Sequence, residues 1–263
     1  MRSYLFILPL IGVLGILPAR AEDKAETTNT PPKGFTALFN GKDLTGWQGL
    51  VEIQKRQKLQ SDPTAYAAAV KATEKTLANW KVQKNGVLYY DGKSNSLQTV
   101  KDYGDIELYL DWKIAPKGDS GLYLRGQPQV QIWDSDNAPG ARGTDKGSGS
   151  GALWNNPENT SLLVDPDKTV SGTTKKIVQE LLAGKRPLVK ADKPVGEWNT
   201  FHIVMRGDKV TVKLNGKLVV EERPLLNFWE RGKPLPKKGP IELQHHGDPL
   251  WFRNIYIKEL DAE

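Results

Sequence analysis

The feature that most constrains the fold of this chain is a succession of short segments, from Trp80 onward, in which apolar and polar residues alternate. Alternation with a period of two residues is typical of β-strands that bury one face. The predicted strands span residues 87–90, 96–100, 105–114, 121–125, 129–133, 201–206, 210–214, 218–221, 241–245 and 251–258. Many short strands at regular spacing indicate a β-sandwich or a jelly roll.

Turn-forming residues separate these segments and support an antiparallel arrangement. Asn215-Gly216 is the strongest hairpin signal, because both central residues of a tight hairpin turn need positive φ, which Asn and Gly tolerate. Further turns are expected at Asp91-Gly92, at residues 117–119 and at Gly207-Asp208.

The amino terminus has the pattern of a secretory signal peptide. Arg2 supplies a positive charge, residues 4–18 form an apolar run, and Ala19-Arg20-Ala21 matches a cleavage site. The run is short and rich in Gly and Pro, whereas a membrane span needs about 20 apolar residues. We therefore expect residues 1–21 to be removed, leaving no membrane span, and the protein to be exported to the periplasm or the extracellular space.

The mature chain is expected to form one domain over residues 34–263, after a polar, flexible leader at 22–33. The sequence contains no Cys, so the domain must be stabilised by its hydrophobic core without disulfides.

Two insertions interrupt the strand pattern, at about 50–79 and 156–193. In the first, residues 66–77 favour a helix, and Asp62-Pro63 could supply its N-cap and first-turn proline. In the second, residues 175–183 are amphipathic and predict a short helix near the rim of a binding site.

The charge pattern argues against a nucleic-acid partner. The formal net charge is +6, and the excess Lys residues are scattered along the chain. Nucleic-acid binding would favour a basic stripe with interleaved aromatic residues, so we interpret these lysines as solvated surface.

Strand alternation sorts side chains onto an inner and an outer face. The outer positions carry carboxylates, amides, aromatic rings, one Arg and one His: Glu107, Tyr109, Asp111, Tyr123, Arg125, Gln129, Gln131, Trp133, Gln244 and His246. Amides and Arg form directed hydrogen bonds with hydroxyl groups, and aromatic faces stack on sugar rings. The pattern favours a carbohydrate site over a merely solvated or covered sheet, and it predicts that Glu107, Arg125, Gln131, Gln244 and His246 form one pocket.

Seven strings between about residues 35 and 260, in order, resemble the 3-keto-disaccharide hydrolase domain family. They are FNGKDLTGW from Phe39, DSGLYLR from Asp119, QVQIWD from Gln129, GEWNT from Gly196, LNGK from Leu214, LQHHG from Leu243 and FRNI from Phe252. The resemblance implies an all-β, concanavalin-like jelly-roll sandwich of two antiparallel sheets, here with helical insertions in its loops. It also implies that the substrate is a glycoside already oxidised to a ketone at sugar C3. The two insertions depart from the family pattern and leave the substrate size open.

A 3-keto-glycoside can be cleaved by removal of its acidified C2 proton, elimination of the C1 substituent and hydration. This chemistry needs a base, an oxyanion partner and a proton donor. The candidates for base or acid are His246, Glu107 and Asp111, and Arg125 is the candidate for the oxyanion partner. The expected substrate-binding residues are Gln129, Gln131, Gln244, Tyr109, Tyr123, Trp133 and Asp134. Asp134 falls on the core side by alternation, so it reaches the site only at a bulge or a strand end.

Two other functions fit the same face. A lectin-like module would bind carbohydrate there without catalysis. A conventional retaining glucanase needs two carboxyls about 5–5.5 Å apart, but residues 129–134 carry amides at two of the three expected acidic positions. We predict no cofactor, because His202, His245 and His246 lack the spacing of a defined metal site, although calcium held by loop carbonyls and Asp residues stays open.

Overall fold

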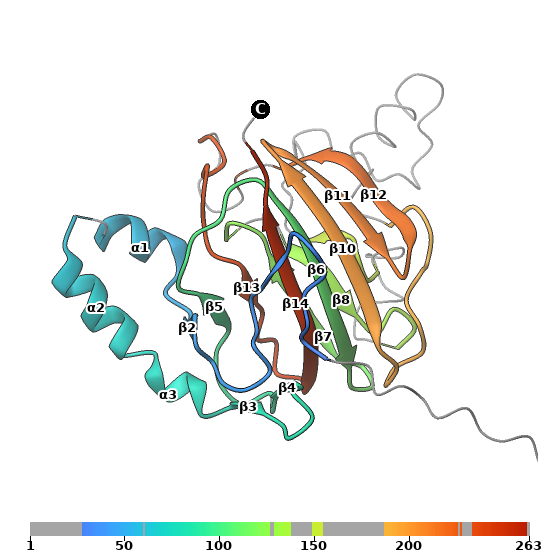
Figure 1. The fold of residues 1–263 in the computed structure, drawn as a ribbon, viewed down its shortest axis with the longest axis horizontal. Coiled ribbons are helices and arrows are strands. Elements are labelled where there is room, and N and C mark those ends of the chain that lie inside the picture. The colour runs from blue at the N-terminus through green and yellow to red at the C-terminus, as the bar shows by residue number, and fades with distance from the viewer. Residues whose placement is uncertain are drawn as a thin grey trace, which may run out of the picture.

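The computed structural model describes residues 28–59, 61–126, 129–137, 149–154, 187–225, 227 and 233–261. Its described part contains two antiparallel sheets and three short helices, arranged as a sandwich with the helices together on one side (Figure 1). The predicted all-β sandwich with helices in a loop is therefore confirmed. The predicted signal peptide and residues 175–183 lie outside the described residues, as does most of the second insertion.

The larger sheet, called sheet A here, is built around the long strand β6 (Ile106–Ile114). Strand β1 (Thr36–Ala37) also pairs with β14. The other strands follow the order β12 (Lys217–Pro224), β11 (Lys209–Leu214), β10 (Asn199–Arg206), β6, β14 (Leu250–Glu259), β4 (Leu88–Tyr90) and β3 (Trp80–Val82).

The second sheet, called sheet B here, contains strands from five separate parts of the chain. Their order is β2 (Trp47–Gly49), β5 (Leu97–Thr99), β13 (Glu242–Leu243), β7 (Asp119–Tyr123), β8 (Gln129–Trp133) and β9 (Leu153–Trp154). Successive strands β4, β5, β6 and β7 alternate between the two sheets, as in the expected jelly roll.

The hydrophobic core lies between the inner faces of the two sheets. Along β6, Ile106, Leu108 and Leu110 are fully buried, while the intervening side chains stand on the outer side. Burying a side chain of this size contributes about 1.5–3 kcal/mol relative to exposure. The largest fully buried side chains are Trp112, Tyr90, Phe39, Phe201 and Phe252.

The predicted helical insertion at 50–79 forms α1 (Ile53–Leu59), α2 (Pro63–Lys71) and α3 (Glu74–Leu77). As predicted, Asp62 caps α2, because its Oδ1 accepts the backbone N–H of Ala65 at 2.9 Å, and Pro63 opens the first turn. The helices lie beside β2 and β5 of sheet B (Figure 1). Among the described residues, the helices are too short or too polar to cross a membrane.

The described part of the predicted leader, from Thr28, is held against sheet A. The side chain of Asn29 donates to the carbonyl of Gly86 at 2.8 Å and accepts the N–H of Asn254 at 2.9 Å. Just beyond the leader, the ring of Phe35 packs edge-to-face on Tyr109 of β6, with centroids 5.4 Å apart. This segment therefore covers part of the outer face of sheet A.

Candidate active site

A row of polar side chains crosses the outer face of sheet B. Strand registers align Gln48, Gln98, Glu242, Tyr123 and Gln129 across β2, β5, β13, β7 and β8. Each is less than a tenth exposed, although all stand on the outer side of the sandwich. Polar groups are rarely buried without a structural or functional reason, so this row marks a site rather than an ordinary surface.

A pocket of about 270 Å³ opens above this row. One wall is residues 50–54, which lead from β2 into α1, and the floor is the sheet itself. The volume lies just below the range of about 300–1,000 Å³ for drug-sized ligands, which suits a single sugar ring. We call it the Glu242 pocket, and its chemically important lining residues are Glu52, Ser96, Gln98, Glu242, Gln244 and His245.

Glu242 is the titratable group at the centre of this pocket. Burial raises the pKa of its carboxyl to about 7, against a hydrogen bond from Ser96 that favours the charged form. The negative charge of Glu52 adds to the upward shift. A carboxyl that titrates near neutral pH can both accept and return a proton during a reaction.

His245 presents a fixed hydrogen-bond donor to the same pocket. The Tyr90 hydroxyl accepts the N–H of Ser94 at 2.8 Å and lies 2.6 Å from His245 Nδ1. The N–H of Gly247 donates to Nδ1 at 3.2 Å, so Nδ1 is an acceptor and the Tyr90 hydroxyl is its second donor. The neutral ring therefore carries its proton on Nε2. Burial, aided by the neighbouring charge of His246, lowers the pKa of His245 and keeps the ring neutral.

Gln98 is a buried amide in the lining of the pocket. Its side chain is fully buried, and neither its amide nitrogen nor its amide oxygen has a hydrogen-bond partner among the described residues. Leaving a buried polar group unsatisfied costs about 1–3 kcal/mol. A bound sugar could satisfy both amide atoms only if the pocket wall shifts to uncover them, because each atom has almost no exposed surface.

A second group of polar side chains flanks the pocket on β7 and β8. The amide of Gln129 donates to Gln244 Oε1. A side chain at Gly121 would collide with that of Gln129, so this glycine makes room for it. Tyr123, Gln129, Gln131, Trp133, Gln244 and His246 stand together on the outer side of sheet B, as their alternation predicts.

Asp119 connects this flanking group to His246. Its Oδ1 accepts the amide of Gln131 at 2.7 Å, and its Oδ2 lies 3.6 Å from His246 Nδ1. Burial raises the pKa of Asp119, although the charge of His246 acts against that rise. His246 is about half exposed and stands beside the pocket rather than in its lining.

The prediction of one shared pocket is wrong for Glu107, and Tyr109 and Asp111 also lie on the opposite side of the sandwich. All three are on β6 in sheet A, whose outer face points away from that of sheet B. Glu107 Oε1 pairs with His202 Nε2 at 2.8 Å, and the ring of Tyr109 stacks on His202 at 4.3 Å. These side chains pack against one another on sheet A.

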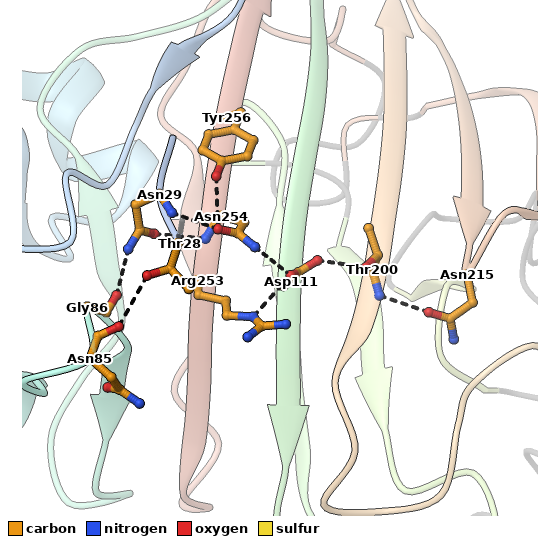
Figure 2. A network of polar contacts seen from close by, with 10 residues as sticks. All are labelled: Thr28, Asn29, Asn85, Gly86, Asp111, Thr200, Asn215, Arg253, Asn254 and Tyr256. Atoms are coloured by element: carbon orange, nitrogen blue, oxygen red, sulfur yellow. Dashed lines mark hydrogen bonds and ion pairs between the residues drawn. The ribbon is translucent and has the colours of Figure 1, made fainter. Parts of the chain in front are cut away.

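Asp111 is the centre of a polar network that joins three strands of sheet A (Figure 2). Its carboxylate accepts hydrogen bonds from Thr200 Oγ1 at 2.6 Å on β10 and from Asn254 Nδ2 at 2.8 Å on β14. It also forms an ion pair with Arg253 Nε at 3.2 Å. These contacts indicate a structural role for Asp111, not a catalytic one.

Arg125 is also away from the pocket, contrary to its predicted outward position. Strand β7 ends at Tyr123, and Arg125 has a φ of +53°, so the alternation no longer applies to it. Its guanidinium is buried and donates to the carbonyls of Gly104 and Gly207 and to Asp105 Oδ1 at 2.5 Å. It therefore holds two loops together at one end of the sandwich.

Asp134 directly follows β8, at a strand end, but its carboxylate accepts hydrogen bonds from backbone N–H groups. Oδ2 accepts the N–H of Lys117 at 2.8 Å, and Oδ1 accepts the N–H of Asn137 at 3.0 Å. Asp134 closes a turn, and it does not line the Glu242 pocket.

Sequence reasoning missed Glu242, His245 and Gln98 as site residues. The outward parity of Glu242 with Gln244, and of Gln98 within its strand, was available as a signal. His245 carries no such signal, because its direction depends on the loop after β13 and on Tyr90 of the other sheet. In the described part of the chain, no three His, Cys, Asp or Glu residues are grouped so that they could hold a metal ion.

Comparison with known proteins relates this geometry to a family. A curated 3-keto-disaccharide hydrolase of Bacteroides thetaiotaomicron is 23% identical over 270 residues, covering 87% of this chain and 79% of that protein. Two crystal structures of candidate glycosyl hydrolases from Parabacteroides distasonis share the fold. One has a TM-score of 0.62 at 22% identity, covering 89% of this chain and 100% of the other. The second has a TM-score of 0.53 at 24% identity, covering 97% and 94%.

The family model described as the 3-keto-alpha-glucoside-1,2-lyase-like domain matches residues 34–258, which include both sheets and every residue of the Glu242 pocket. The chain therefore belongs to the 3-keto-alpha-glucoside-1,2-lyase-like domain family.

Proposed function

We propose that this protein cleaves the glycosidic bond of glycosides whose sugar C3 has been oxidised to a ketone. The observation that carries the proposal is Glu242, a buried carboxyl whose pKa is raised to about 7 in a pocket with an unsatisfied amide. Family membership supports the general assignment to carbohydrate chemistry. The name of the Bacteroides thetaiotaomicron relative supports the keto-sugar substrate.

The first step is removal of the C2 proton by the Glu242 carboxylate. The C2–H electrons form a C2=C3 double bond, and negative charge develops on the former ketone oxygen. The Nε2–H of His245 is the candidate donor to this oxygen, since Nδ1 is already occupied by Tyr90 and Gly247. A neutral imidazole that donates to a developing enolate avoids a full proton transfer.

The second step is departure of the aglycone. The C3–O⁻ carbonyl re-forms, the C2=C3 electrons move to C1=C2, and the C1–O bond breaks. The glycosidic oxygen takes the proton that Glu242 has just received, so one carboxyl serves as base and then as acid. Addition of water across C1=C2 gives the free 3-keto sugar, which makes the net reaction a hydrolysis.

His246 and Asp119 form a second candidate pair for proton transfer. They lie on the same face as the pocket and are 3.6 Å apart. They are suited to deliver or remove the proton in the hydration step, which follows release of the aglycone. If Glu242→Gln loses turnover while His246→Ala still releases the aglycone by elimination, the first step belongs to Glu242.

The test is aglycone release from a purified 3-keto-glucoside and from its unoxidised parent. We expect release only from the 3-keto-glucoside, and Glu242→Gln should abolish it. Equal cleavage of both substrates would contradict the keto-sugar proposal.

A second candidate reaction is acid–base hydrolysis of ordinary glycosides. It is favoured by one observation, the presence of Glu52 in the same pocket, where its charge raises the pKa of Glu242. Conventional glycoside hydrolysis uses a pair of carboxyls that flank the scissile bond. This reaction would be favoured if the wild-type protein cleaves the unoxidised parent glucoside and Glu52→Gln does not. Binding of both sugars without cleavage of either would instead indicate a lectin-like module.

A further inference from the structure

A second cavity of about 570 Å³ lies next to the Glu242 pocket, and neither proton-transfer step uses it. It is framed by α1 and α2 on one side and by the segments after β5 and before β13 on the other. We call it the Tyr66 cavity. Its polar lining is Arg56, Gln57, Asp102 and Lys238, and its apolar lining is Ile53, Leu59, Pro63, Tyr66, Val100, Pro236 and Pro240.

The two cavities are adjacent and share two walls. Ile53 and Pro240 line both of them. The hydroxyl of Tyr66 also accepts a hydrogen bond from the amide of Gln48, at 3.3 Å, and Gln48 belongs to the polar row of sheet B. Ile53 and Pro240 therefore form the boundary between the Glu242 pocket and the Tyr66 cavity.

The frame of the Tyr66 cavity is anchored, and part of its surface is apolar. Arg56 of α1 forms an ion pair with Asp102 at 2.5 Å, which ties the helix to the segment after β5. Val100 is 54% exposed, although it is a large aliphatic residue beside this cavity. The exposed aliphatic side chain of Val100 suits a flat apolar ring, which could also stack on the Tyr66 ring.

We propose that the Tyr66 cavity is the subsite for the leaving group and that it selects glycosides with an aromatic or other apolar aglycone. The proposal rests on the proposed function, because it places the sugar ring in the Glu242 pocket. It follows from the boundary that the two cavities share at Ile53 and Pro240, and from the aliphatic and aromatic part of the lining. The insertion at 50–79, which supplies α1 and α2, is thus a specificity element.

The test compares two substrates that differ only in aglycone, phenyl 3-keto-glucoside and methyl 3-keto-glucoside of the same anomeric configuration. Val100→Ser removes apolar surface from the cavity at an exposed position, where folding should be little affected. We expect it to lower the phenyl-to-methyl ratio of kcat/KM by about 3- to 10-fold, as for loss of one or two apolar groups from a binding site. Comparing this ratio between the variant and the wild type cancels the difference in leaving-group reactivity between the phenyl and methyl substrates.

Val189→Ser is the matched control. Val189 is 46% exposed and lines neither cavity, so its substitution should leave the ratio within about twofold of wild type. An unchanged ratio in Val100→Ser, or the same change in both variants, would overturn the subsite.

Failure of the proposed function is distinguishable from failure of the subsite. If the wild-type protein cleaves neither 3-keto-glucoside, the proposed reaction is wrong. Calorimetric binding of unoxidised phenyl glucoside and methyl glucoside then tests the cavity alone. An apolar subsite predicts that the wild-type protein binds phenyl glucoside more tightly than methyl glucoside. It also predicts that Val100→Ser weakens binding of the phenyl glucoside about 3- to 10-fold, whereas Val189→Ser does not. Equal affinities in all three proteins would refute it.

Discussion

Glu242 and Gln98 are buried although they stand on the outer side of a sheet, because residues 50–54 cover them. Burial gives Glu242 its raised pKa and leaves the Gln98 amide without a partner among the described residues. Both effects destabilise the protein locally. Costs of this kind are expected where a binding or catalytic role selects the residue.

Glu242→Gln should separate catalysis from folding. The amide fits the same space but cannot accept the C2 proton, so turnover should fall about 100- to 10,000-fold. The measurement is kcat/KM on a 3-keto-glucoside, together with circular dichroism to confirm the fold. Turnover within threefold of wild type would exclude Glu242 as the base.

The same substitution should also change how stability depends on pH. The pKa of Glu242 is about 7 in the folded protein and about 4.3 in an unfolded chain, so the folded state binds this proton more tightly. Stability is therefore lost as pH rises from about 4.3 through 7. Glu242→Gln should be more stable than wild type at pH 8, by up to roughly 3.5 kcal/mol, and should show no gain near pH 4. Urea unfolding at both pH values measures this, and a loss of stability at pH 8 would instead indicate a structural carboxylate.

At the scale of single elements, local signals predicted the hairpin β11–β12 and the start of α2 correctly, but the helix expected over 66–77 is divided into α2 and α3 at Ala72 and Thr73. Asn215 and Gly216 have φ of +50° and +79°, as a tight hairpin turn requires. What could not be predicted is that the Asn215 side chain bonds the Ala191 carbonyl and Asn199 Oδ1, both at 2.8 Å. Such contacts join residues far apart in the sequence, and alternation or turn chemistry carries no information about them.

Asn215→Ala should destabilise the protein for two separable reasons. Alanine at positive φ costs about 1–2 kcal/mol, and the lost side-chain hydrogen bonds contribute about 1 kcal/mol each. Asn215→Gly, the matched control, keeps the backbone conformation and loses only the side-chain bonds. We expect Asn215→Ala to unfold at lower urea concentration than Asn215→Gly, which in turn unfolds below wild type. Equal midpoints for the two variants would show that backbone strain is not important at this turn.

At the scale of the whole molecule, alternation separates core from surface but does not say to which sheet a strand belongs. Both sheets of a sandwich bury their inner faces in one core, so the outer faces of β6 and β7 point in opposite directions. This is why Glu107 and Asp111 were grouped with Gln131 and Gln244. Sheet membership depends on long-range pairing between strands, for which a single sequence provides no direct signal.

The two outer faces should therefore respond differently to substitution. Asp111→Ala removes the centre of the network in Figure 2, and it should lower the free energy of unfolding by about 2–4 kcal/mol while kcat/KM of the folded protein stays within twofold. Urea unfolding and steady-state kinetics measure both quantities.

Gln98→Leu is the counterpart on sheet B. It replaces an unsatisfied buried amide with an apolar side chain of similar size, so stability should stay level or rise. Loss of hydrogen bonds to the sugar should lower kcat/KM by about tenfold or more. If Gln98→Leu is the less stable variant and Asp111→Ala the less active one, the assignment of the two faces is reversed.

The hydrogen bond from Tyr90 to His245 has a consequence for how charge moves during turnover. In the proposed reaction, the imidazole with its occupied Nδ1 would act as a stationary dipole, and it would neither gain nor lose a proton when the enolate forms and collapses. The only proton to travel in that elimination would be the one passed from C2 through Glu242 to the departing oxygen. The pocket therefore begins and ends that step with the same electrical charge, so a new substrate could enter without waiting for proton exchange with the solvent.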